Sequence, residues 1–181
     1  MANALVQTSK FLSLVLRHRP ALIGLTLDAN GWADVADLIA RANAHGHALS
    51  RATLDRVVAE SDKQRFALSP DRTRIRANQG HSVEVELDLP PADPPEFLYH
   101  GTATRFLASI RAGGLIPGTR RHVHLSHDMA TAARVGARHG VAVVLTVRAG
   151  AMHAAGHQFW VSANGVWLAD RVPAEFLEFP A

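Results

Sequence analysis

Apolar residues recur at helical spacing three times in the first 61 residues. The spacing predicts helices over residues 5–17, 32–44 and 51–61. Pro20 should end the first helix near residues 17–18, because proline disfavours helical backbone in the residue before it. Ser50 is the expected N-cap of the third helix. Residues 25–27 are expected to form a short strand.

A hairpin is expected directly after the third helix. Residues 65–68 and 73–77 read as its strands, with a turn at Ser69, Pro70 and Asp71. Three short helices followed by a hairpin are typical of a winged-helix domain.

The second half of the chain alternates short strands with helices. Strands are expected over residues 97–101, 123–126, 141–147, 158–162, 166–169 and 176–179. Helices are expected over residues 104–112 and 129–139, and Gly113 and Gly114 follow the first of them as a stop signal. The whole chain is therefore predicted to be α+β.

A proline-rich acidic stretch separates the two halves. It contains the prolines Pro90, Pro91, Pro94 and Pro95, which cannot continue a helix or a central strand. We therefore predict a first lobe over residues 1–88, a linker over 89–96 and a second lobe over 97–181.

Composition and charge narrow the class of protein. The 181 residues are 48% apolar and 19% charged, which excludes wholesale disorder. The absence of cysteine excludes thiol catalysis and cysteine-ligated metals. No apolar run is long enough for a membrane helix, and the first 30 residues do not resemble a signal peptide, so a cytoplasmic protein is expected.

The charge is unevenly distributed along the chain. Residues 1–82 carry a net charge of +4 and residues 97–181 also carry +4, whereas residues 83–96 carry −5. Two basic lobes favour a polyanionic partner. The excess of arginine over lysine is compatible with phosphate binding and equally with a bias in the coding sequence.

Eleven histidines raise the question of a metal site. His122 and His124 would share one face of a strand, as two ligands could. No obvious third ligand accompanies them, so a catalytic metal is not favoured.

Four local strings carry more polar chemistry than packing requires. They are LRHRP over residues 16–20, RIRANQGHS over 74–82, YHGT over 99–102, and HVHLS over 122–126 together with VGARHG over 135–140. Each also has a purely structural interpretation, such as cations near a helix C-terminus or an exposed hairpin edge.

Taken together and in this order, the strings resemble the RNA (tRNA) 2′-phosphotransferase family. The stretches DANGWADVADL and SANGVWLADRVP also match its pattern, and the resemblance extends from about Ser9 to Phe179. It implies a winged-helix N-terminal lobe and an NAD-binding C-terminal lobe of the ADP-ribosyltransferase fold, in a monomer.

The resemblance also implies a reaction. Family members remove an internal RNA 2′-phosphate, such as that at a tRNA splice junction, with NAD+ as acceptor and no metal. The phosphate first attacks C1″ of NAD+ and expels nicotinamide, which gives an RNA-2′-phospho-ADP-ribose intermediate. The ribose O2″ then attacks phosphorus, which yields 2′-OH RNA and ADP-ribose 1″,2″-cyclic phosphate.

The family's functional residues fall on matching positions of this chain. The implied catalytic residues are Arg17, His18, Arg76 and Arg138. The implied NAD+-binding residues are His100, Gly101, Thr102, His124, Leu125 and Ser126. Arg74 could be confused with Arg76, which is favoured because it adjoins the AxQGHS string.

Two other functions remain open at this point. The same fold could stop after the first step and leave ADP-ribose on phosphorylated nucleic-acid ends. A winged-helix DNA-binding regulator with a ligand-sensing second domain would explain the helices and the charge, but not the YHGT and HVHLS strings.

Overall fold

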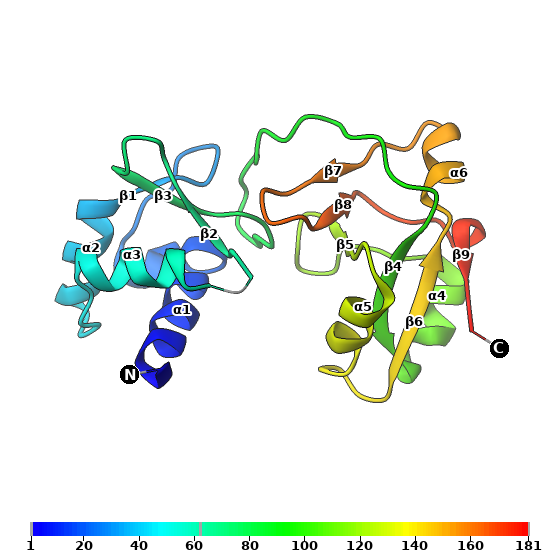
Figure 1. Ribbon diagram of the computed structural model, residues 1–181, viewed down its shortest axis with the longest axis horizontal. Helices are drawn as coiled ribbons and strands as arrows, with labels where there is room; N and C mark the ends of the chain where they lie inside the picture. The colour runs from blue at the N-terminus through cyan, green and yellow to red at the C-terminus, as the bar shows by residue number, and fades with distance from the viewer. Residues whose placement is uncertain (1, 62, 181) are drawn as a thin grey trace. The chain divides into compact units, whose positions relative to one another are not determined.

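The computed structural model describes residues 2–61 and 63–180, and the chain divides into two compact units between Asp88 and Leu89 (Figure 1). We describe each unit by itself. None of the described helices is long and apolar enough to cross a membrane.

The first unit combines helices with a small antiparallel sheet. Its elements are α1 (Ala2–Arg17), the 3-10 helix η1 (Pro20–Ile23), β1 (Ala33–Asp34), α2 (Val35–Ala44), α3 (Arg51–Ala59), β2 (Phe66–Leu68) and β3 (Arg74–Ala77). β3 is the central strand, with the order β1-β3-β2. The predicted hairpin is thereby confirmed.

Apolar faces of the helices meet the sheet in one core. Leu12 and Leu16 of α1, Leu38 of α2, Leu54 of α3 and Ile75 of β3 are fully buried in it. Ser50 caps α3 as predicted, because its side chain accepts a hydrogen bond from the Thr53 N–H.

Two predictions for the first unit are wrong. Residues 25–27 form no strand, although Leu25 is buried, so its apolar character reflects packing rather than a ladder. The second helix begins at Val35 rather than at residue 32, because Ala33 and Asp34 pair with β3 and the Asp34 side chain then accepts from the Asp37 N–H.

The second unit contains two three-stranded antiparallel sheets. Its elements are β4 (Leu98–Ala103), η2 (Thr104–Phe106), α4 (Leu107–Gly113), β5 (Val123–Leu125), α5 (Met129–Gly136), β6 (Ala142–Val147), α6 (Ala149–Ala154), β7 (Trp160–Val161), β8 (Trp167–Ala169), η3 (Ala174–Phe176) and β9 (Leu177–Glu178). The strand orders are β4-β6-β9 and β5-β8-β7. Both units are mixed, so the α+β class is confirmed.

Helix α5 packs very closely on β4. A Cβ placed on Gly101 would lie 1.7 Å from the Ala132 carbonyl oxygen, and one on Gly136 would lie 2.5 Å from the Thr102 carbonyl oxygen. The helix and the strand therefore approach each other through two glycines, which lets backbone touch backbone.

Three details of the second unit differ from the prediction. Helix α6 was not expected, because Ala-Gly-Ala-Met-His-Ala is short and carries a glycine with low helix propensity. The predicted helix over 129–139 ends at Gly136, and the predicted strand over 158–162 is reduced to Trp160–Val161. The narrower names, winged helix and ADP-ribosyltransferase fold, stay predictions.

Candidate functional site

Arg17 and His18 lie at the C-terminal end of α1. The Arg17 Nη2 donates a hydrogen bond to the Arg65 carbonyl oxygen at 3.2 Å, and its guanidinium carbon lies 5.9 Å from the centre of the Phe66 ring. Arg17 is half-buried, whereas His18 is exposed just beyond the helix. These contacts fix Arg17 between α1 and the start of β2.

The segment after β3 returns to the end of α1. Gly80 has a φ of 83°, a left-handed conformation that favours glycine, and the backbone N–H groups of Ser82 and Val83 then donate to the Arg17 carbonyl oxygen. The Ser82 Oγ lies 3.0 Å from the Nδ1 of His18. The QGHS string is thus brought against the LRHRP string, although His18 and Ser82 are 64 positions apart in the sequence.

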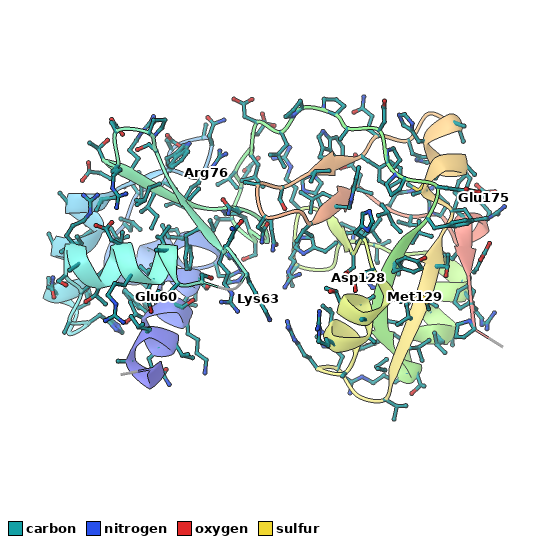
Figure 2. All side chains as sticks on the ribbon, in the orientation of Figure 1. Glu60, Lys63, Arg76, Asp128, Met129 and Glu175 are labelled. Carbon is teal, nitrogen blue, oxygen red and sulfur yellow. The ribbon has the colours of Figure 1, made fainter. Side chains whose placement is uncertain are left out.

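Arg76 and Arg74 occupy the same face of β3 but different surroundings. The Arg76 guanidinium carbon lies 4.6 Å from the centre of the Trp32 ring, and its Nη1 donates to the Leu87 carbonyl oxygen at 3.4 Å. Arg76 is labelled in Figure 2. Burial lowers the pKa of Arg76. Arg74 is exposed and forms an ion pair with Asp28, at 3.5 Å. Among the described residues, Arg76 forms no such ion pair.

His81 lies in the middle of these groups. Only 3% of its surface is exposed, and neither ring nitrogen has a hydrogen-bond partner among the described residues. Burial and, to a smaller extent, the positive charges of Arg17, His18 and Arg76 together lower the pKa of His81 to about 4. Three predicted catalytic residues therefore share one neutral, buried histidine as a neighbour. His81 lies within the RIRANQGHS string but was not among the site residues predicted from the sequence.

Acidification is expected to destabilise the first unit through His81. Its pKa is about 4 when folded and 6.5 in the ordinary reference state. Between these pH values the unfolded chain binds a proton that the folded chain does not, so stability present above pH 6.5 is lost as the pH falls towards 4. The loss can reach about 3 kcal/mol.

Urea unfolding at pH 7 and pH 4.5 measures this effect. The His81→Asn variant should show a smaller loss of stability between the two pH values than the wild type. The matched variant His127→Asn, which removes an exposed histidine, should keep the full loss. An unchanged pH dependence in His81→Asn would show that His81 does not carry it.

In the second unit, β4 positions His100. The His100 Nδ1 lies 3.1 Å from the His124 carbonyl oxygen, and because a carbonyl only accepts, Nδ1 must carry the proton. The Nε2 of the neutral ring is then a hydrogen-bond acceptor. Burial lowers the pKa of His100, which favours this neutral form.

Gly101 presents its backbone to the open edge of β4. Tyr99 exchanges both of its backbone hydrogen bonds with Ser126, whereas β6 pairs along the other edge of β4. Residues two apart on an antiparallel strand direct their N–H and C=O groups to the same edge. The backbone N–H and C=O groups of Gly101 therefore point away from β6. The side chains of Thr102 and Leu125 are buried.

Arg120 lies close to His124 and Arg138 in the second unit. The Arg120 Nη1 lies 2.9 Å from the His124 Nδ1, so this nitrogen accepts from the guanidinium. Burial lowers the pKa of Arg120, and the nearby charge of Arg138 lowers it too. Arg138 is exposed and follows α5. Arg120 was not predicted from the sequence, although it stands two positions before the HVHLS string.

The His122 side chain contacts Asp170 and Trp160. Its Nε2 lies 3.7 Å from an Asp170 carboxylate oxygen, and its ring centre lies 5.3 Å from that of Trp160. Within residues 2–61 and 63–180, no three histidine or acidic side chains gather in a way that could hold a metal ion.

The predicted site residues thus form two groups. Arg17, His18 and Arg76 come together in the first unit, and the structure adds His81 and Ser82 to them. Arg138 and the six residues predicted to bind NAD+ belong to the second unit.

Comparison with known proteins gives a consistent result. Residues 3–171 match the profile of a family described as "RNA 2′-phosphotransferase, Tpt1 / KptA family". The chain is 60% identical over 179 residues to a "Probable RNA 2′-phosphotransferase" of Streptomyces griseus, with 95% of each chain covered. Proteins of the same description from Agrobacterium fabrum (61% over 174 residues, covering 96% of this chain and 94% of that protein) and Pseudomonas aeruginosa (58% over 176 residues, 97% of each) are similarly close.

Proposed function

The chain belongs to the RNA 2′-phosphotransferase family, and on that premise we propose that it transfers an internal RNA 2′-phosphate to NAD+. The products are 2′-OH RNA, nicotinamide and ADP-ribose 1″,2″-cyclic phosphate. The observation that carries the proposal is the convergence of Arg17, His18 and Arg76 around buried His81.

The first step forms a bond between a 2′-phosphate oxygen and C1″, and it breaks the bond from C1″ to the nicotinamide nitrogen. The electron pair of that bond leaves with nicotinamide, which departs neutral. The second step forms a bond between O2″ and phosphorus and releases the RNA 2′-oxygen. O2″ loses a proton and the RNA 2′-oxygen gains one, so atoms and charge balance.

The first group of residues suits the phosphate. Arg17 and Arg76 keep their positive charge at any working pH and can bind a phosphate through paired N–H groups. The two arginines stabilise the negative charge that spreads over the phosphate oxygens in the transition state of the second step. His18 is exposed and held by Ser82, so it can exchange a proton with O2″ or the departing 2′-oxygen.

The second group suits NAD+. The N–H and C=O of Gly101 at the open edge of β4 match the donor and acceptor of a carboxamide such as that of nicotinamide. The His100 Nε2 can accept from a ribose hydroxyl. Arg120 and Arg138 place two cations near His124, where a phosphate could be bound, and Arg138 is the fourth predicted catalytic residue.

Incubation with a 2′-phosphorylated oligoribonucleotide and NAD+ tests the proposal. We expect one nicotinamide for each 2′-phosphate removed, and ADP-ribose 1″,2″-cyclic phosphate as the second product. Activity should survive EDTA, because arginines rather than a metal would supply the positive charge. ADP-ribose left permanently on phosphorylated ends, with no phosphate removed, would instead identify a capping ADP-ribosyltransferase. Loss of turnover in EDTA with restoration by zinc or magnesium would contradict the metal-free mechanism.

A further inference from the structure

The DANGW stretch over residues 28–32 has no role in the reaction as described so far. In the structure it forms a tight loop that Asp28 closes. The Asp28 Oδ1 accepts hydrogen bonds from the N–H groups of Asn30 and Trp32, each at 2.9 Å, and the Asp28 N–H donates to the Trp32 carbonyl oxygen. Gly31 has a φ of 78°, a conformation that favours glycine. The loop therefore fixes the backbone that carries the Trp32 side chain.

Two arginines of β3 lie over the Trp32 ring. The guanidinium carbon of Arg76 is 4.6 Å from the ring centre, and that of Arg74 is 5.5 Å from it. At these distances the negative face of an indole attracts a cation. The shorter contact belongs to Arg76, the residue predicted to be catalytic.

Asp28 makes a difference between the two arginines. Its carboxylate forms an ion pair with Arg74, at 3.5 Å. Arg76 is held instead by the Trp32 ring and by the 3.4 Å hydrogen bond to the Leu87 carbonyl oxygen, and its buried Nε has no hydrogen-bond partner among the described residues. A neutral ring and a neutral carbonyl hold a guanidinium without an ion pair, so Arg76 stays available to an anion.

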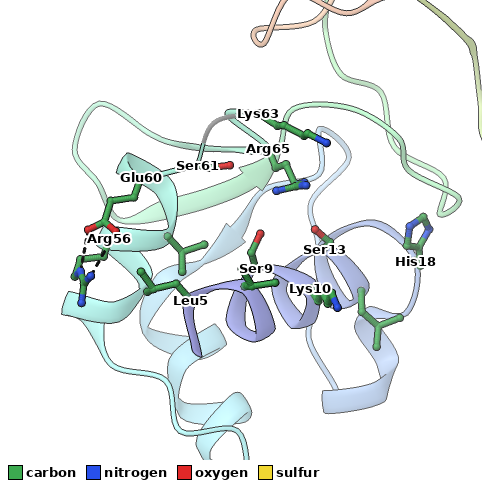
Figure 3. A pocket seen from close by; sticks show the side chains of 13 residues that line it. Leu5, Ser9, Lys10, Ser13, His18, Arg56, Glu60, Ser61, Lys63 and Arg65 are labelled. Atoms are coloured by element: carbon green, nitrogen blue, oxygen red, sulfur yellow. Dashed lines mark hydrogen bonds and ion pairs between the residues drawn. The ribbon is translucent and has the colours of Figure 1, made fainter. Parts of the chain in front are cut away.

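Packing and cavity lining do not explain the place of Trp32. Its side chain is only partly buried, and it lies outside the apolar core that the described residues of the first unit form. A cavity of about 780 Å³ in the same unit includes His18 in its lining, but neither Trp32 nor Arg76 is among the described lining residues (Figure 3). The neighbours that the ring does have are the guanidinium groups of β3.

We propose that Trp32 is a positioning residue for Arg76, and that its ring holds the guanidinium in the orientation that binds the 2′-phosphate. The inference rests on the proposed function. A guanidinium binds phosphate through N–H groups of fixed geometry, so its orientation matters as well as its charge. A guanidinium that rotates freely loses part of its effect on the transition state.

Substitutions of Trp32 test the proposal. Trp32→Leu should lower the rate of 2′-OH RNA formation about tenfold, because Arg76 keeps its charge but loses its fixed orientation. Trp32→Phe keeps an aromatic face and should stay within about threefold of wild type. In an Arg76→Ala background, Trp32→Leu should change the rate by less than about twofold, because no guanidinium is left to position. An additive loss in the double variant, or a loss in Trp32→Phe as large as in Trp32→Leu, would overturn the inference.

Fluorinated tryptophan analogues at position 32 separate the cation–π contact from the shape of the ring. Fluorine withdraws electrons from the ring face and weakens its attraction for a cation, while the shape changes little. The rate should therefore fall stepwise as the number of fluorines rises, and this test remains decisive if Trp32→Leu does not fold. A constant rate would show that the ring acts by its shape or by stacking on an RNA base, and would overturn the inference.

Phe11→Leu is the matched control. Phe11 is also an aromatic residue of the first unit, and its ring stacks on that of His47 with the ring centres 3.8 Å apart. This variant removes an aromatic contact elsewhere in the unit and should keep the wild-type rate. A loss as large as that in Trp32→Leu would show that the activity responds to any lost aromatic contact, and would contradict a specific role of Trp32.

NMR of the arginine side chains separates this inference from the proposed function, because it needs no turnover. The Nε–H resonance of Arg76, assigned by its absence in Arg76→Lys, should be shifted upfield by the indole ring. Trp32→Leu should remove this shift, and should raise the concentration of inorganic phosphate needed to perturb the resonance. If wild-type protein gave these results but removed no 2′-phosphate, the proposed reaction would be wrong and the positioning would stand. An active protein whose Arg76 resonance is the same in Trp32→Leu would overturn the inference alone.

Discussion

Replacing Arg76 with alanine should slow the formation of 2′-OH RNA about 10²–10³-fold, because a cation that favours the transition state is lost. Replacing Arg74 should leave the rate within about fivefold of wild type, since an exposed ion pair contributes little. Both variants remove one positive charge from the same face of β3. The difference between them therefore reports the position of the guanidinium and not the net charge.

The two variants should also differ in what accumulates. If Arg76 acts mainly in the second step, RNA-2′-phospho-ADP-ribose should build up in Arg76→Ala and appear as a slower-migrating labelled RNA, and His18→Ala should behave in the same way. His100→Ala should instead weaken the use of NAD+ and leave no intermediate. Rapid-quench gels with a nicotinamide assay measure both steps.

Equal loss of nicotinamide release and product formation in Arg76→Ala and His18→Ala, with nothing trapped, would contradict a role in the second step. If Arg74→Ala slowed the formation of 2′-OH RNA as much as Arg76→Ala, the assignment of the catalytic role to Arg76 instead of Arg74 would be wrong.

Replacing Gly101 with alanine should unfold or severely destabilise the second unit. The added Cβ would lie 1.7 Å from the Ala132 carbonyl oxygen and 2.8 Å from the Gly136 nitrogen, both of them backbone atoms that cannot rotate away. Helix α5 would have to move off β4, at a cost of about 3 kcal/mol or more. In a unit of this size that cost lowers Tm by about 12 °C or more.

Gly113→Ala is the matched control. Gly113 ends α4, and a Cβ built there meets nothing within 4 Å. The Tm of Gly113→Ala should therefore differ little from that of the wild type. Thermal unfolding followed by circular dichroism and calorimetry compares the two variants. If Gly101→Ala kept the wild-type Tm but no longer bound NAD+, the glycine would serve the ligand alone and the packing argument would be wrong.

Short-range features of the sequence predicted much of the secondary structure. The helix that ends before Pro20, the Ser50 cap and the hairpin turning at Pro70 all depend on residues within a few positions of one another. Helix α6 escaped prediction because it is short and contains a glycine, and strand β7 is shorter than predicted because only Trp160 and Val161 pair with β8. The motif strings likewise indicated the family, which the comparisons confirmed.

Gly101 illustrates where the sequence was insufficient. The family resemblance implied that Gly101 in the YHGT string binds NAD+, and the structure in addition places the backbone of α5 against its Cα. Its N–H and C=O still face the open edge of β4. Only the packing of a helix some 30 residues further along the chain reveals that one glycine can serve both purposes.

The sequence by itself determined most of the elements, the α+β class and the family, because local backbone preferences and apolar spacing are properties of neighbouring residues. The tertiary structure alone decided which polar side chains become buried together. His81 is neutral and central because the segment after Gly80 folds back onto the end of α1. The charge of Arg76, and not that of Arg74, is among those that lower the pKa of His81. Burial and electrostatic coupling depend on chain segments that meet only in the folded state.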